Sequence, residues 1–399
     1  MIGKMGIRRL AAALFGCAWL CTLGVGSAGA AEAYDLPVIL SLTGGASFLG
    51  KAEQQSLRLI EKWVNENGGI RGRTLHLVFY DDQSSPQTAV QLASQVVGAH
   101  PAVEIGANLV AMCNAMAPLM QSGPVMYCLS PGIHPPAGSF VFTSSVSTYD
   151  LSKALLRYFR LKGWMKLALM TSTDASGQDA EKGIDTNLAL PENKDMKMVA
   201  REHFNPSDVS VSAQIENIKA AQPQAFIAWS TGAPIGTIFK GIVQAGLDVP
   251  VGTTDGNMTF AQMTQYADFL PKRLYIPAAE WAMHGTTLER EPAVAAAQER
   301  FETLFKAAGI VPDVASALAW DPAMIIIDAL RELGLDASAA EVRARIAGTK
   351  GYAGVDGIYD YVRVPQRGLD ENDAVVTLWS AAKKTWEPVS RPGGIPLVK

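Results

Sequence analysis

Six short loops hold the residues of this chain that could do chemistry, and their composition favours binding of a small anion. Several of them are rich in Gly, Ser, Thr and Asn, which leave backbone N–H groups accessible at helix starts. Such N–H groups favour a carboxylate or another anion. The loops span residues 43–50, 107–113, 130–136, 171–177, 230–234 and 253–258.

Motifs that would indicate catalysis are missing from the sequence. It contains no G-x-S-x-G, H-E-x-x-H or P-loop pattern, and the loop at 43–50 lacks the dinucleotide-binding fingerprint. The chain has 5 histidines and no close His/Cys/Asp cluster. We therefore expect a binding protein that is not an enzyme and needs neither a metal ion nor another cofactor.

The elements that position these loops alternate between strand and helix. Apolar segments at 38–42, 75–80, 102–106 and 125–129 predict strands, and the same pattern resumes at 166–170, 197–204, 225–229 and 250–253. Helices are predicted between them, including one at 209–221 that Asp208 would cap. Longer helices follow at 293–308, 315–333 and 339–347, and a last strand at 374–380.

This alternation predicts an α/β fold with two Rossmann-like, doubly wound sheets. The length of the chain also favours two lobes over one domain. Ligands of open α/β sheets bind beyond the carboxyl ends of the strands, where the six loops lie.

The first 30 residues are typical of a cleavable signal peptide. A basic start at Lys4, Arg8 and Arg9 precedes an apolar run at 10–25 and an A-x-A site at 28–30. We expect an exported, periplasmic protein, and a lipid anchor at Cys17 is the alternative. Loss of this segment removes three basic and no acidic residues, so the formal charge changes from −4 to −7. That charge argues against nucleic acid or an anionic membrane as a partner.

Two cysteines remain after the predicted signal, Cys113 and Cys128. In an oxidising compartment this pair is a disulfide candidate. A loop of 15 residues closed by such a bond contributes ~3 kcal/mol to stability. The alternative is a pair of buried free thiols.

Four motifs give the sequence a resemblance to the periplasmic leucine/isoleucine/valine-binding protein family, the type I solute-binding proteins of ABC importers. Each motif is modest alone, but their order and spacing across the chain are specific. They are Leu42-Thr43-Gly44 with Gly50, Asn65-x-x-Gly68-Gly69-Ile70-x-Gly72, Tyr80-Asp81-Asp82 followed by Pro86, and Ala245-Gly246-Leu247 leading to Asp255-Gly256.

The resemblance implies two lobes joined by a three-strand hinge, which close on a ligand in the cleft between them. Residues 34–146 and 283–361 would form the N-terminal lobe, and residues 147–282 and 362–399 the C-terminal lobe. A monomeric protein of this kind delivers its ligand to ABC permease subunits in the inner membrane. A soluble exported sensor domain that presents the same ligands to a signalling partner is the alternative.

The resemblance also suggests how an amino acid would be held. Family members bind the ligand carboxylate with hydroxyl groups and backbone N–H groups of the first lobe, and the ammonium with a carboxylate of the second. Asp255 matches that acidic position and could accept a charge-assisted hydrogen bond. The alternative is that Asp255 caps a helix that begins near Thr259.

The sequence departs from the amino-acid binders at several of these positions. Val110 and Ala111 stand where a serine is usual, His134 where a threonine is usual, and Gly232 where an aromatic residue is usual. His134 could donate to a carboxylate or lie at the surface. The aromatic residues Phe48, Trp229, Trp281 and Trp320 could stack on a ligand or pack in a core.

These departures favour an aromatic or larger hydrophobic acid over a small amino acid. The predicted ligand-binding residues are Thr43, Ser47, Phe48, Asn108, Val110, Ser130, Gly132, His134, Ser176, Gly232, Asp255 and Trp281.

Overall fold

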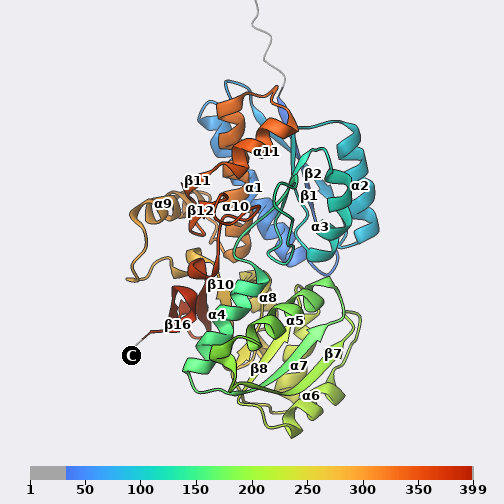
Figure 1. Ribbon diagram of the computed structural model, residues 1–399, viewed down its shortest axis with the longest axis vertical. Coiled ribbons are helices and arrows are strands. Elements are labelled where there is room, and N and C mark those ends of the chain that lie inside the picture. Colours follow the sequence, from blue (N-terminus) through green and yellow to red (C-terminus); the bar gives the residue numbers. More distant parts are fainter. Residues whose placement is uncertain (1–32, 398–399) are drawn as a thin grey trace, which may run out of the picture. The chain divides into compact units, whose positions relative to one another are not determined.

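Two sheets organise the computed structural model, which describes residues 33–397 (Figure 1). The predicted signal peptide lies outside these residues. The first sheet is parallel throughout and has the order β2-β1-β3-β4-β5. Its strands are β1 (Tyr34–Leu40), β2 (Leu75–Asp81), β3 (Val103–Gly106), β4 (Val125–Cys128) and β5 (Val141–Thr143).

Helices cover both faces of this first sheet because the side chains of its strands alternate between two apolar clusters. In β1, Leu36, Val38 and Leu40 belong to one buried cluster and Ile39 to the other. The covering helices are α1 (Ser47–Glu66), α2 (Pro86–Gly98), α3 (Val110–Met116), α10 (Val314–Leu333) and α11 (Ala339–Ala347).

The second sheet has the order β14-β13-β10-β9-β8-β6-β7, and only β13 and β14 run antiparallel to their neighbours. Its strands are β6 (Lys166–Ser172), β7 (Lys197–Phe204), β8 (Ala225–Trp229), β9 (Val251–Gly252), β10 (Leu274–Ala278), β13 (Val375–Ser380) and β14 (Thr385–Pro388). The helices of this part are α4 (Thr148–Leu161), α5 (Ala175–Leu188), α6 (Ser212–Ala220), α7 (Ile235–Gln244) and α8 (Phe260–Gln265).

The chain passes between the two sheets three times. It leaves the first sheet after β5, returns from β10 by way of α9 (Pro292–Ala307) to α10, which packs on α1, and enters the second sheet again at β13. Short antiparallel pairs, β11 (Lys350–Ala353) with β12 (Ile358–Asp360) and β15 (Ser390–Arg391) with β16 (Ile395–Pro396), accompany the last part. The assignment of residues to two lobes stays a prediction.

The predicted α/β class is confirmed, and one local prediction is wrong. Asp208 does not cap α6, which begins at Ser212 after Val211. Its carboxylate instead accepts a hydrogen bond from the backbone N–H of Asn205 at 2.8 Å, within the loop before the helix. A short aspartate side chain can satisfy a nearby turn as well as a helix start.

A disulfide joins α3 to the end of β4. Cys113 and Cys128 have an S–S distance of 2.04 Å and a Cα–Cα distance of 6.0 Å. Both residues are fully buried among apolar side chains. The disulfide prediction is therefore confirmed, and the alternative of two free thiols is wrong.

Candidate functional site

A narrow, buried pocket lies between elements of the two sheets. The volume that the centre of a water molecule can occupy inside it is about 20 Å³. One water molecule needs roughly 10–15 Å³ on this measure, so the pocket has little free room. Its walls are Leu49, Asn108, Leu109, Val110, Leu129, Ser130, Pro131, Gly132, Thr148, Ser176, Trp229, Thr231, Thr254, Asp255, Gly256 and Leu318.

The positions of these residues follow from the strand order. The segments 108–110 and 129–132 come directly after β3 and β4 of the first sheet. Trp229 ends β8, and the segment 254–256 follows β9 of the second sheet. The carboxyl ends of parallel strands meet at one edge of a sheet, so the two sheets present two groups of loops to the same space.

Asp255 supplies the strongest polar feature of the pocket. Its Oδ1 accepts a hydrogen bond from the hydroxyl of Thr254 at 3.0 Å. Its Oδ2 is buried and has no hydrogen-bond partner among residues 33–397. Burial raises the pKa of this carboxyl group to about 6, although hydrogen bonds from Thr254 and Gly256 and the positive charge of Arg367 act in the opposite direction.

The helix-capping alternative for Asp255 does not hold for α8. The hydroxyl of Thr259 caps that helix by accepting from the backbone N–H of Gln262 at 3.1 Å. Asp255 instead begins a short 3₁₀ segment, Asp255–Asn257. The free oxygen of Asp255 is therefore not needed by α8.

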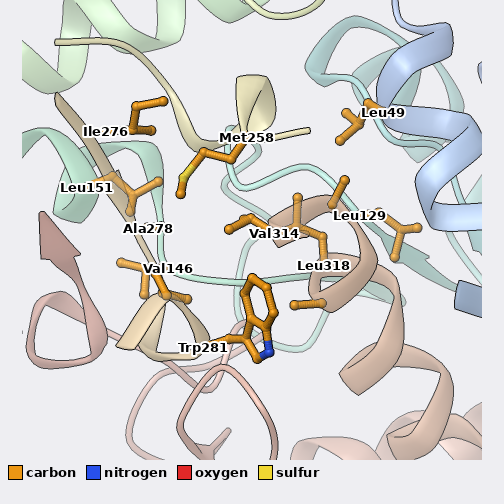
Figure 2. Close-up of a cluster of buried hydrophobic side chains, with 14 of the residues drawn as sticks. Leu49, Leu129, Val146, Leu151, Met258, Ile276, Ala278, Trp281, Val314 and Leu318 are labelled. Carbon is orange, nitrogen blue, oxygen red and sulfur yellow. The ribbon is translucent and has the colours of Figure 1, made fainter. Parts of the chain in front are cut away.

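The rest of the pocket is largely apolar. Leu49 of α1, Leu129 after β4 and Leu318 of α10 come from the first sheet and its helices, and Trp229 faces them from the second. Figure 2 shows Leu49, Leu129 and Leu318 within a larger group of buried apolar side chains. A ligand here would meet an aspartate oxygen on one side and hydrocarbon on others.

Arg367 holds the loop after β4 against the pocket. Its guanidinium group donates to the carbonyl oxygens of Pro131 and Ile133 at 3.0 and 2.7 Å, and to those of Ser144 and Ser145 at 3.2 and 3.1 Å. Burial lowers the pKa of Arg367 to about 10, against the opposing effect of nearby carboxylates. The arginine stays charged at neutral pH and fixes the wall formed by Ser130, Pro131 and Gly132.

Six of the predicted ligand-binding residues line the pocket: Asn108, Val110, Ser130, Gly132, Ser176 and Asp255. The Asn108 amide is already engaged, because it accepts from the Ser41 N–H at 3.3 Å and donates to Glu53 at 2.6 Å. The Ser176 and Thr231 hydroxyl groups are 2.9 Å apart. Asn108 therefore shapes the wall, Ser176 is engaged by Thr231, and Ser130 places its hydroxyl group in the same pocket as Asp255.

Three predicted residues of the first loop lie away from the pocket. Thr43 is exposed, and its hydroxyl and N–H groups donate to Asp81 at 2.7 and 3.1 Å. Ser47 and Phe48 line a separate groove beside the start of α8, in which the centre of a water molecule can occupy about 520 Å³. The Phe48 ring meets the Tyr266 ring edge-on, with centroids 6.1 Å apart.

The other predicted residues outside the pocket lie around it. Gly232, with φ +85°, touches the first loop, and a Cβ there would lie 2.5 Å from the carbonyl oxygen of Gly45. Trp281 is buried, stacks on His284 with centroids 4.1 Å apart, and lies with Leu318 and Val314 in the cluster of Figure 2. His134 pairs with Asp179 at 2.8 Å.

Thr148, Thr231 and Arg367 are part of the site but were not predicted from the sequence. Thr231 lies beside Gly232 in the loop at 230–234, which the strand pattern had already indicated as a ligand-binding loop, so the sequence predicted its loop but not its side chain. Thr148 begins α4, and its place in the wall depends on where the first crossover turns. Arg367 lies between β12 and β13, where the sequence shows no regular pattern.

Two further findings concern only the part of the chain that the structure describes. Residues 33–397 contain no group of three or more His, Cys, Asp or Glu side chains placed to hold a metal ion. Within the same residues, no helix combines the length and apolar character needed to cross a bilayer.

Comparisons with known proteins agree with this architecture. A family model described as periplasmic binding protein matches residues 34–381. Leu/Ile/Val-binding protein homolog 3 of Brucella melitensis biotype 1 is 33% identical over 81 residues, which are 20% of this chain and 22% of that relative. The aligned segment thus spans about a fifth of the relative's length.

Two solved structures with the same fold carry bound ligands. One is the branched-chain amino acid transporter substrate binding protein LivJ from Streptococcus pneumoniae in complex with isoleucine, with a TM-score of 0.74 and 18% identity over 90% of this chain and 99% of that chain. The other is an ABC transporter solute binding protein from R. palustris in complex with benzoate, with a TM-score of 0.71 and 18% identity over 92% and 98%. At these identities the likeness concerns the fold alone.

Proposed function

The chain belongs to the periplasmic binding protein family, and from this premise we propose that it is the extracytoplasmic solute-binding component of an ABC transporter. Its role would be to capture a small amino acid or carboxylic acid and deliver it to permease subunits. The protein would act by closing two lobes around the ligand and would perform no catalysis.

The unpartnered Oδ2 atom of Asp255 is the observation that carries this proposal. A buried carboxylate oxygen without a hydrogen bond is costly, and a ligand that donates to it removes that cost. An ammonium group is the best such donor because it also supplies the opposite charge. The geometry therefore supports an amino acid better than a plain acid.

The remaining walls fit the other end of such a ligand. Ser130 and Thr148 stand on the part of the pocket built by the first sheet and the first crossover, and their hydroxyl groups suit a carboxylate. Leu129, Trp229 and Leu318 suit a compact apolar side chain. The buried position of Asp255, which is 1% exposed, means that the lobes must separate before a ligand can enter.

An aromatic acid is the second candidate, and the apolar lining with Trp229 favours it. The solved structure in complex with benzoate is an example of a protein with the same fold that binds such a ligand. In that case Asp255 would need to be protonated to donate to the ligand. Its raised pKa, about 6, makes that easier than for an exposed aspartate.

A thermal-shift screen separates these candidates. The panel holds leucine, isoleucine, valine, phenylalanine, benzoate and phenylpropanoate, each tested at several concentrations. A ligand at 100 times its dissociation constant stabilises the folded state by about 2.7 kcal/mol, which a melting curve detects. We expect an amino acid to raise the melting temperature most, and an absence of any shift from this panel would overturn the proposed ligand class.

The Asp255→Asn variant tests the role of the carboxylate with calorimetry on the ligand that the screen selects. Loss of a charge-assisted hydrogen bond costs roughly 1.5–3 kcal/mol, so we expect about a 10- to 100-fold weaker affinity. Asp248→Asn is the matched control, because Asp248 is exposed, pairs with Lys272 and Arg273, and does not line the pocket. Unchanged affinity in Asp255→Asn would contradict the ammonium assignment.

A further inference from the structure

Arg367 is a buried cation whose hydrogen bonds all go to backbone oxygens. The residue lies between β12 and β13 and is only 6% exposed. Its guanidinium group donates to four carbonyl oxygens, and none of the ion pairs among residues 33–397 includes it. The carboxylates of Asp150, Asp179 and Asp255 balance its charge only at longer range. Buried charges are usually paired directly, so the charge of Arg367 acts instead on the backbone that it binds.

The carbonyl oxygen of Pro131 transmits the effect of this charge toward the pocket. It accepts from Nη2 of Arg367 at 3.0 Å and belongs to the trans peptide group that joins Pro131 to Gly132. The C=O and N–H bonds of a trans peptide group point in opposite directions, so the N–H of Gly132 points away from the guanidinium group. A hydrogen bond from a cation to the carbonyl oxygen polarises the peptide group and makes its N–H a stronger donor.

The N–H of Gly132 in turn donates to the hydroxyl oxygen of Ser130 at 3.4 Å, and both residues line the pocket. The backbone of Ser130 is already used, because its N–H donates to Sγ of Cys128 at 3.3 Å and its carbonyl oxygen accepts from the Thr143 hydroxyl at 2.6 Å. Within residues 33–397, the hydroxyl hydrogen of Ser130 has no acceptor. Arg367, the Pro131–Gly132 peptide group and the Ser130 hydroxyl therefore form a hydrogen-bond relay that ends in a free donor.

The pocket thus has two recognition points of opposite character. Asp255, on the loop after β9, has a carboxylate oxygen without a partner, whereas Ser130, after β4, has a hydroxyl hydrogen that the relay polarises. An amino acid has an ammonium group for the first point and a carboxylate for the second. A carboxamide in place of the carboxylate could still accept from Ser130, but it would bring no negative charge for the relay to stabilise.

We propose that Arg367 is a positioning residue that makes the pocket selective for a carboxylate over the corresponding amide, and that it acts through the relay. The guanidinium group orients and polarises the relay without touching the ligand. Hydrogen bonds to an ionised acceptor are roughly twice as strong as those between neutral groups, so a polarised donor favours the acid. The proposal rests on the proposed function and specifies how one end of its ligand is recognised.

The test compares acids with their own amides by calorimetry at pH 6.5, where the ammonium groups of leucine and leucinamide are both protonated. The two pairs of compounds are leucine with leucinamide and benzoate with benzamide. The measured quantity is the Kd of the amide divided by the Kd of the acid. General damage to the pocket weakens the binding of both members of a pair, whereas loss of the relay lowers this ratio.

Three variants change the relay. In Arg367→Gln we expect the ratio to fall by about five- to tenfold, because the relay loses its charge. Arg367→Lys keeps the charge but cannot reproduce the planar fork that holds the carbonyl oxygens, so we expect a fall of about two- to threefold. This milder variant supplies the answer if Arg367→Gln does not fold. Ser130→Ala removes the end of the relay and should lower the ratio at least as much as Arg367→Gln.

Arg157→Gln is the matched control. Arg157 also donates to the backbone of a distant segment, at the carbonyl oxygen of Gly393 at 2.7 Å, and it does not line the pocket. This variant should keep the ratio of the parent. Circular dichroism and melting curves establish that every variant is folded before its affinities are compared.

An unchanged ratio in the folded Arg367 variants would overturn the relay, and so would a parent that binds an amide as tightly as its acid. An equal fall in Arg157→Gln would also overturn it, because the effect would not be specific to Arg367. In each of these cases the parent still binds its ligand, so the proposed function stands. A parent that binds none of the four compounds would refute the ligand class and the relay together.

Discussion

Glu104 of β3 offers the sharpest test of how a buried charge affects this fold. The residue is fully buried, and both of its carboxylate oxygens lack a hydrogen-bond partner among the described residues. Val103 and Ile105 on either side belong to one apolar cluster, so Glu104 faces the opposite side of the sheet. Its register partner on β4 is Met126, a member of the second apolar cluster.

Burial alone raises the pKa of Glu104 from 4.5 to about 8. Between these two values the folded state binds a proton that the unfolded state has released, so stability falls as pH rises. Protonated Glu104 leaves the stability unimpaired below pH 4.5, and stability is lost progressively as the pH rises to about 8. At about 1.36 kcal/mol per pKa unit, the full loss amounts to roughly 4–5 kcal/mol.

Glu104→Met removes the titrating group and keeps a side chain of similar length. We expect its free energy of unfolding at pH 8 to exceed that of the parent by about 2–4 kcal/mol, with a much smaller gain at pH 5. Urea unfolding at pH 5, 6, 7 and 8, followed by circular dichroism, measures the difference.

Two further variants make the Glu104 test specific. Glu104→Gln should abolish the same pH dependence but gain less stability, because its amide also lacks a partner. Glu216→Gln on exposed α6 should change the unfolding free energy by less than about 0.5 kcal/mol at every pH. An unchanged pH slope in Glu104→Met would refute the reasoning.

Three other predictions follow from local geometry. Gly232→Ala should lower the closed population more than Gly246→Ala, as measured by the distance between spin labels on Cys introduced at the exposed positions Gln91 of α2 and Glu216 of α6. Both glycines have positive φ, but only at 232 would a Cβ meet Gly45, at 2.5 Å, and equal effects would contradict this. Cys113→Ala combined with Cys128→Ala should cost about 3 kcal/mol in urea unfolding, and an unaltered midpoint would contradict the bond's role. Affinity for an amino acid should fall below pH 6 as Asp255 takes up a proton, whereas affinity for benzoate should not; calorimetry at pH 5 and 7.5 distinguishes them.

The sequence predicted the alternating core of the fold well, because buried strands and amphipathic helices carry strong periodic signals. The helix expected at 339–347 coincides with α11, and that at 315–333 begins one residue after α10. The strands β5, β10, β11, β12, β14, β15 and β16 were missed. β14 includes Pro388 and pairs only with β13 at the edge of the sheet, so neither burial nor alternation marks it.

The candidate site was predictable at the level of loops but less so at the level of side chains. Ser130 and Asp255 line the pocket because both follow parallel strands, a relation that the sequence contains. Thr43 and His134 lie in equally well-predicted loops, yet Asp81 and Asp179 engage their side chains elsewhere. Those partners are 38 and 45 residues away in the chain, so no local sequence pattern predicts these pairings.

Under the proposed function, the unpartnered oxygen of Asp255 gives a physical reason for lobe closure to depend on a ligand. Two of the polar contacts that join the sheets near the pocket, between Ala233 and Gly45 and between His134 and Asp179, contribute about 1 kcal/mol each. Enclosure also buries an oxygen of Asp255 that has no partner, which costs a comparable amount. A ligand that donates to Asp255 adds its interaction to the closed form only, so it shifts the population by its differential affinity.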